Sequence, residues 1–240
     1  MPSAPKYKRV VLKVSGESLC TPGGWGIEAA AVESLAGELL PLVGMGVQVA
    51  LVVGAGNILR GRQLVGAAGV RRATADYMGM MATVINALAL RDCLENRGGA
   101  AVAMSAIAMP SVCETWNRWD AVEHLRSGRI VILAGGTGNP FLTTDTCAAL
   151  RACELQAEVV LKATKVDGVF DSDPMSNPQA KRYDKLTYQK VLADNLGVMD
   201  LSAVSLCMEA GIPIIVFKLS TPGNLAAVVR GKNIGTIVTC

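Results

Sequence analysis

The chain has only one histidine among its 240 residues, and this scarcity narrows the chemistry that it can perform. The HExxH pattern of zinc proteases needs two histidines on one helix face, so that class is excluded. No serine or cysteine stands with a third partner in a recognisable relation to His124, so a histidine-based nucleophilic triad is not indicated. His124 lies in a predicted helical segment, residues 120–126, and we expect its imidazole to be solvated on the helix surface.

Metal-type cysteine pairs and membrane spans are also missing. The seven cysteines are odd in number and include no CxxC pair, which favours buried reduced thiols over a zinc site or a disulfide framework. Hydrophobic residues make up 51% of the chain and the mean hydropathy is +0.37. The least charged stretches, 98–113 and 130–144, nevertheless fall short of the ~20 apolar residues of a membrane helix. The apolar excess therefore predicts a large core, a subunit interface, or both.

Runs of basic residues and a secretory signal are absent too. Lys13 and Glu17 interrupt the apolar stretch that a signal peptide would need, so we expect a cytoplasmic protein without a membrane partner. The net charge is +3, and the 23 basic residues are scattered, without the basic and aromatic clusters of a nucleic-acid groove. No nucleic-acid partner is expected, whereas a small anion needs only two or three well-placed cations.

Short β-branched runs alternate with longer helical segments, which predicts an α/β fold. Strands are predicted at residues 9–14, 47–53, 100–104, 130–134, 158–162, 214–217 and 236–238. Helices are predicted at residues 28–40, 71–96, 120–126, 144–153, 200–210 and 223–229. Strands that are apolar throughout and separated by helices favour a mostly parallel sheet covered on both faces.

Two local features complete this prediction. Pro41 is expected to bend or end the first helix. Residues 171–185 are dense in turn-forming residues, so we expect a long loop there that is a candidate ligand flap. No internal repeat, linker or domain boundary is visible.

Four predicted strands run directly into glycine-rich or polar segments. These segments are residues 15–17, 54–57, 135–145 and 163–168. The carboxyl ends of parallel strands share one edge of the sheet, where open α/β folds bind ligands. Glycine lets the backbone approach an anion closely, and the N–H groups of a following helix point at it. With Lys13, Arg60, Lys162 and Lys165 nearby, this edge is predicted to bind several phosphates.

Neither common nucleotide fingerprint is present. The Gly-Lys pair at 231–232 is followed by Asn233 and is not part of a P-loop, and Leu59 stands where GxGxxG needs its third glycine. The phosphate site is therefore expected to be assembled from several loops.

Several motifs occur in order along the whole chain. They are Lys-Val-Ser-Gly at 13–16, the loop 54–60, Asp-Tyr-Met-Gly-Met at 76–80, Gly-Thr-Gly-Asn-Pro-Phe at 136–141 with Thr-Thr-Asp at 143–145, Lys-Ala-Thr-Lys-Val-Asp-Gly-Val at 162–169, Val-Met-Asp-Leu at 198–201 and Pro-Gly-Asn at 222–224. In these motifs and their spacing the chain resembles the bacterial UMP kinases of the amino-acid-kinase family. The segments 136–141 and 162–168 are specific to that branch of the family.

The resemblance implies one amino-acid-kinase domain over residues 1–240, folded as an αβα sandwich. It implies transfer of the γ-phosphoryl group of ATP, with Mg²⁺, to UMP, giving UDP and ADP in pyrimidine nucleotide biosynthesis. It also implies a homo-oligomer, a hexamer built from dimers, and a nucleotide effector such as GTP or UTP. Because the acceptor is a phosphate oxygen that is already deprotonated, no catalytic base is required.

The resemblance also assigns residues. It implies ATP contacts for Lys13, Val14, Ser15, Gly16, Gly56, Arg60, Lys162, Thr164, Phe170 and Asp173. It implies UMP contacts for Ala55, Asp76, Thr137, Gly138, Asn139, Pro140, Phe141, Leu142, Thr143 and Thr144. It implies catalytic roles for Lys13, Arg60, Asp145 and Asp200, the last two as organisers of Mg²⁺ or of the lysines. The residues alone leave two of these open, since Asp200 equally suits a helix cap and Asp76 a helix-dipole partner.

Two departures from the family pattern bear on function. Ala55 replaces the middle one of three glycines, and its methyl either crowds the acceptor phosphate or points away. Arg91 and Arg129 match basic positions of a GTP site at subunit contacts, but Glu95 and Val102 stand where a histidine and an arginine are common. We therefore expect little or no activation by GTP.

Two other functions remain open at this level. A different amino-acid kinase would act on N-acetylglutamate, glutamate, aspartate or carbamate, and the segment 136–141 argues against it. A non-catalytic relative would bind a nucleotide or store molybdate. Retention of Lys13, Arg60 and Asp145 favours catalysis, and the single histidine argues against storage of a metal oxide.

Overall fold

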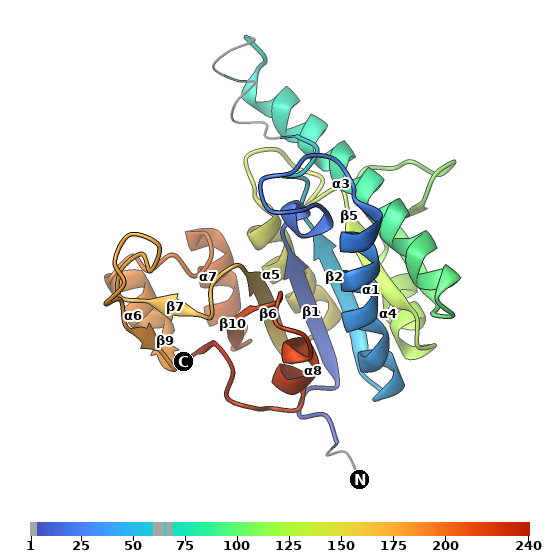
Figure 1. Cartoon of the computed structure of the whole chain (residues 1–240). Helices are drawn as coiled ribbons and strands as arrows, with labels where there is room; N and C mark the ends of the chain where they lie inside the picture. The colour runs from blue at the N-terminus through green and yellow to red at the C-terminus, as the bar shows by residue number, and fades with distance from the viewer. Residues whose placement is uncertain (1–3, 60–64, 66–68) are drawn as a thin grey trace.

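The computed structural model describes residues 4–59, 65 and 69–240. Among these residues, nine strands form one sheet in the order β4-β3-β5-β2-β1-β6-β10-β11-β9 (Figure 1). The strands are β1 Arg9–Val14, β2 Gln48–Val53, β3 Ala101–Ser105, β4 Glu114–Thr115, β5 Ile130–Ala134, β6 Val159–Thr164, β9 Lys185–Thr187, β10 Ile214–Lys218 and β11 Thr236–Thr239. The seven strands from β4 to β10 pair in parallel, and β11 runs antiparallel to β10.

The central strands are apolar because both of their faces are covered. Alternate side chains of β1 enter two separate cores, with Val10, Leu12 and Val14 on one face and Val11 on the other. Helices α1 Ala29–Gly44, α3 Arg72–Asn96 and α8 Asn224–Val229 cover the first face. Helices α4 Arg118–Arg126, α5 Thr144–Leu155, α6 Tyr188–Ala193 and α7 Leu201–Glu209 cover the second. Figure 1 shows α1 and α8 in front of the sheet and α5 behind it.

The predicted α/β class, with a mostly parallel sheet between helical layers, is confirmed. All seven predicted strands and all six predicted helices are present, and their observed ends differ from the predicted ones by a few residues. The short elements were not predicted: a 3₁₀ turn η1 Gly16–Leu19, the strands β4 and β9, helix α6, and a two-stranded hairpin of β7 Val169–Phe170 with β8 Arg182–Tyr183. They are two to six residues long, too short to show a hydrophobic period.

Two local expectations need correction. Helix α1 does not end at Pro41 but continues to Gly44. The proline ring is exposed, so water can donate a hydrogen bond to the backbone carbonyl that the missing N–H of Pro41 leaves unpaired. Residues 171–185 are not one loop either, because β8 and the start of β9 lie within them and only 171–181 connect the strands of the hairpin.

Within the described ranges, no helix combines the length and the apolar character needed to cross a bilayer.

Candidate active site

Three charged side chains meet at the carboxyl edge of the sheet. Lys13 Nζ lies 2.9 Å from one carboxylate oxygen of Asp145, and Lys162 Nζ lies 2.8 Å from the other. Strands β1 and β6 are in parallel register with Lys13 opposite Lys162, which brings the two lysines side by side. Asp145 stands in the first turn of α5, the helix that follows β5. We call these three residues the charged centre.

The carboxylate of the charged centre stays ionised. Burial alone would raise the pKa of Asp145, but the ammonium groups of Lys13 and Lys162 outweigh it and the pKa lies below the ordinary value. All three side chains are between 12% and 16% exposed, so water screens their attraction only weakly. The centre therefore carries two positive charges and one negative charge at neutral pH.

The two glycine loops beside the charged centre touch each other. A Cβ on Gly16 would lie 2.7 Å from Gly56 N and 2.8 Å from Gly54 O, so only glycine fits there. Ser15, the N-cap of η1, accepts a hydrogen bond from Glu17 N. The backbone at the start of η1 and the backbone of the loop after β2 thus converge at one point, as a phosphate cradle requires.

A pair of buried asparagines fixes the second loop to α3. Asn57 Nδ2 donates to Asn86 Oδ1 at 3.0 Å, and Asn86 Nδ2 donates back to Asn57 Oδ1 at 2.8 Å. Asn86 Nδ2 also donates to Gly54 O at 2.8 Å. Because these amides satisfy one another away from water, they hold the loop in one place.

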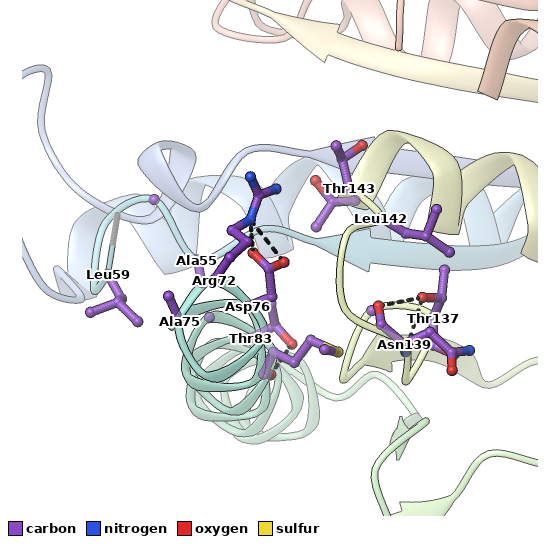
Figure 2. A pocket seen from close by; sticks show the side chains of 15 residues that line it. Ala55, Leu59, Arg72, Ala75, Asp76, Thr83, Thr137, Asn139, Leu142 and Thr143 are labelled. Carbon is purple, nitrogen blue, oxygen red and sulfur yellow. Dashed lines mark hydrogen bonds and ion pairs between the residues drawn. The ribbon is translucent and has the colours of Figure 1, made fainter. Parts of the chain in front are cut away.

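A cavity of about 230 Å³ opens between α3 and the segment that connects β5 to α5 (Figure 2). Gly56 borders it. Many of the residues predicted to contact UMP border it as well, namely Ala55, Asp76, Thr137, Asn139, Leu142, Thr143 and Thr144. Ala55 is therefore part of the cavity wall. We call this space the acceptor cavity.

Asp76 does more than complement the dipole of its own helix, because its carboxylate also binds the segment on the opposite side of the acceptor cavity. Its carboxylate accepts from Phe141 N at 2.9 Å and from Arg72 Nε at 2.9 Å. Figure 2 shows Arg72 and Asp76 facing each other, with Thr137 and Asn139 on the opposite side. Asp76 thereby joins the start of α3 to the connection between β5 and α5.

Asp200 is the N-cap of α7, which was one of its two predicted roles. Its carboxylate accepts from Ala203 N and Thr146 Oγ1, each at 2.8 Å, and from Thr143 Oγ1. Thr143 in turn caps α5, accepting from the backbone N–H groups of Asp145 and Thr146. Asp200 therefore supports the helix end that carries both Asp145 and part of the acceptor cavity.

A second cavity, of about 460 Å³, lies on the other side of β1. Ser15, Thr164 and Lys165 border it, together with residues of α1. Lys165 Nζ lies 2.6 Å from Glu17 Oε2 beside it. We call this space the donor cavity. Residues next to the charged centre in the chain line both cavities: Thr144, which precedes Asp145, lines the first, and Ala163, which follows Lys162, lines the second.

Some predicted residues lie elsewhere. Phe170 and Asp173 are in or just after β7 and do not border the donor cavity. Gly138, Pro140 and Phe141 belong to the acceptor segment without lining its cavity. Arg60 lies outside the described residues. In the part of the chain that the structure describes, no three acidic, histidine or cysteine side chains gather closely enough to hold a metal ion.

The structure adds residues that sequence analysis missed. Arg72 and Thr83 border the acceptor cavity, and Thr83 Oγ1 accepts from Gly135 N at 2.8 Å. Two signals were available. Arg72 and Asp76 have the i, i+4 spacing of a helical ion pair, and Thr83 is a polar residue on the apolar side of a long helix.

Comparison with known proteins agrees with this geometry. Residues 8–218 match the model of the amino acid kinase family. A uridylate kinase from Legionella pneumophila is 53% identical over 97% of this chain and 94% of its own length. The crystal structure of a UMP kinase from Bacillus anthracis superposes with a TM-score of 0.94 at 39% identity, covering 97% of this chain and 96% of that one. A UMP kinase from Ureaplasma parvum gives a TM-score of 0.92 at 34% identity, covering 98% and 100%. The resemblance drawn from the motifs is thus confirmed, and the chain belongs to the amino acid kinase family, in its uridylate kinase branch.

Proposed function

We propose that this protein is an ATP-dependent UMP kinase, which transfers the γ-phosphoryl group of ATP to UMP and yields UDP and ADP for pyrimidine nucleotide synthesis. The observation that carries the proposal is the charged centre, whose neighbours in the chain line both the acceptor cavity and the donor cavity. An in-line transfer needs two nucleotides whose phosphates meet at one cationic point. The names of the relatives support the choice of acceptor.

The residues of this chain suit a reaction that needs charge stabilisation and no base. A phosphate oxygen of UMP attacks the γ-phosphorus of ATP, and the bond from that phosphorus to the bridging oxygen of ADP breaks. Lys13 and Lys162 neutralise charge that moves onto the transferred group and the leaving oxygen. Asp145 holds both ammonium groups in place. The neighbouring backbone at Gly16 and Gly56 can approach the phosphates closely because neither residue has a side chain.

We propose that Mg²⁺ arrives as part of the MgATP substrate. Both oxygens of Asp145 face lysines, and Asp200 accepts hydrogen bonds as a helix cap, so neither carboxylate is set up as a resident metal ligand. In kinase sites Mg²⁺ usually binds the substrate phosphates and keeps several water ligands, and it is not held in a cage made of protein groups alone. In this proposal Asp145 positions the two lysines and Asp200 supports the start of α5, and neither residue binds the metal.

The acceptor is tested by one coupled ADP-release assay with UMP, CMP, dUMP, N-acetylglutamate and carbamate at equal concentration. We expect UMP to react fastest. Faster turnover of CMP, an amino acid or carbamate would refute the assignment, and binding of ATP and UMP without turnover would identify a non-catalytic nucleotide binder.

We further propose that the protein forms a homo-oligomer, a hexamer by the family resemblance. Tyr77, Met81 and Ile85 lie four residues apart along α3 and are 42%, 45% and 52% exposed, so they form an apolar stripe on one helix face. We expect sedimentation to show an assembly that Ile85→Glu dissociates. As a control, Met175→Glu replaces an 85% exposed residue away from α3 and should leave the assembly intact. A wild-type monomer of 25 kDa at micromolar concentration would contradict the proposal.

We also propose that GTP, the nucleotide effector implied by the resemblance, has little effect on this protein. Arg91, Glu95, Val102 and Arg129 border one cavity of about 720 Å³ beside β3. An acidic and an apolar side chain weaken an anion site there, so we expect GTP to raise activity by less than about twofold, a small free-energy coupling. A several-fold rise that Arg129→Ala abolishes would show that the cavity binds GTP after all. A cytoplasmic location and a single domain over residues 1–240 are proposed on the same resemblance.

A further inference from the structure

Arg151 is a buried cation next to the acceptor cavity that the proposed reaction does not use. It stands on α5 seven residues after Thr144, hence on the same helix face. Its side chain is 5% exposed and Nη1 lies 2.6 Å from Glu154 Oε2. Cys147, which hydrogen-bonds Arg151, and the alanines and Leu155 of α5 belong to the core around it. A buried guanidinium among such residues needs a reason, since an apolar side chain of that size would pack as well.

Trp116 holds the guanidinium from the other side. The ring centroid lies 4.1 Å from the guanidinium carbon, a stacked cation–π contact. Trp116 follows β4, and its backbone N–H donates to Ser105 O at 2.8 Å, at the end of β3. The plane of the guanidinium is thereby fixed between a ring and a carboxylate, which a lysine ammonium would not achieve.

The fixed guanidinium faces the start of the acceptor segment. Nη2 donates to Gly136 O at 3.4 Å. Gly135 and Gly136 have φ values of +71° and +57°, a left-handed pair that other residues rarely adopt. From the opposite side, Thr83 accepts from Gly135 N. Gly136 itself and Thr137 border the acceptor cavity. The turn is therefore held at its N–H by α3 and at its carbonyl by α5.

We propose that Arg151, stacked on Trp116, is a positioning residue for the acceptor nucleotide: it fixes the turn at Gly135 and Gly136 and so sets the wall of the acceptor cavity. The proposal rests on the UMP kinase activity proposed above. Since the donor cavity has no residue in common with this arrangement, the effect should fall on UMP and spare ATP.

Four variants and a matched control test this. Arg151→Lys keeps the charge beside Glu154 but loses the planar group, and Arg151→Met keeps the bulk alone. Trp116→Leu removes the ring and Trp116→Phe retains one. The control is Trp119→Leu, because Trp119 is 70% exposed and stacks on Arg118 at 4.8 Å in the same way, away from the acceptor segment.

We expect both Arg151 variants and Trp116→Leu to raise KM for UMP by about tenfold, the scale of one lost hydrogen bond to a charged group. KM for ATP and kcat should change by less than about twofold. Trp116→Phe should recover most of the affinity, and Trp119→Leu should resemble the wild type. Equal rises in both KM values, or a lower melting temperature with unchanged KM for UMP, would overturn the proposal and leave Arg151 a core residue.

A readout without substrate separates this inference from the proposed activity. Amide hydrogen exchange at Gly136, Thr137 and Gly138 should be faster in Arg151→Lys than in Trp119→Leu. Unchanged exchange would refute the positioning role even in an enzyme that is active on UMP. An inactive wild type with the expected exchange difference would refute the activity alone.

Discussion

Replacing Lys13 by alanine should lower kcat strongly and the free energy of unfolding only slightly, and so should show whether this lysine is catalytic or structural. The ammonium of Lys13 lies 2.9 Å from Asp145, and residues close to both in the chain, Ser15 and Thr144, line the two cavities. A fixed cation there stabilises the transferring phosphoryl group more than it stabilises bound ATP. Loss of one preorganised group of this kind costs ~3 kcal/mol in the transition state, which lowers kcat by about 10²–10³.

The stability cost of the same change should be small. Breaking a buried ion pair is expensive because a charge is left without a partner, but Asp145 keeps Lys162 at 2.8 Å in the variant. We therefore expect a loss of about 1–2 kcal/mol, near the middle of the range for point mutations. For a chain of this size that corresponds to a fall in Tm of about 2–8 °C.

The assay measures kcat, KM for UMP and Tm on one preparation. Lys190→Ala is the control, because Lys190 pairs with Asp194 on the surface of α6 at 2.6 Å and takes no part in either cavity. It should leave kcat unchanged. If Lys13→Ala lowered kcat by less than about tenfold, less than 1.4 kcal/mol of barrier, Lys13 would not be the cation of the transition state. Loss of kcat only in proportion to unfolded protein would make it a structural lysine.

Three further predictions concern the supports of the site. Gly16→Ala should lower kcat/KM for ATP by at least about tenfold, since its Cβ would meet backbone of the second loop at 2.7 Å, and steady-state kinetics with varied ATP checks this. Asn86→Leu should cost about 1–3 kcal/mol in urea unfolding because the buried Oδ1 of Asn57 loses its donor, whereas Asn96→Leu at the C-terminal end of α3 should not; equal costs would contradict the reasoning. The pKa of Asp145 is lowered in the folded state, so its ionised form contributes stability above the unfolded value of about 3.9, and this contribution is lost as the pH falls through the folded pKa. The gap in Tm between wild type and Asp145→Asn should therefore shrink below about pH 4, and a constant gap would contradict that assignment.

The fold was predictable because its central strands leave little choice. Runs such as residues 130–134, Ile-Val-Ile-Leu-Ala, are buried throughout and fit only a strand covered on both faces. The edge that binds ligands was predictable for the same reason, since parallel strands place all their carboxyl ends together. Lys13 and Lys162 could be expected to lie close once both were placed at that edge, and the register of β1 with β6 puts them opposite each other.

The contacts between loops could not be predicted from the sequence. Asp200 suited a helix cap and a catalytic role equally, and only the position of Thr143 in space shows that its capping hydrogen bonds extend to the neighbouring helix end. Asp76 suited a helix dipole, yet its bond to Phe141 N spans 65 positions of the chain. Such long-range hydrogen bonds leave no local pattern in the sequence, because each depends on where two distant segments of the chain lie in space.

The arrangement of the charged centre indicates how it can accept a polyphosphate without rearranging. An ammonium group has three N–H donors, and Asp145 engages the ammonium groups of Lys13 and Lys162 with separate oxygens. Each lysine therefore retains donors for phosphate oxygens while its position stays fixed. Without Asp145, two ammonium groups on adjacent strands would repel each other and spread apart, and the energy to bring them together would have to come from binding ATP. A carboxylate of lowered pKa between them, on a helix end supported by Asp200, supplies that ordering in advance.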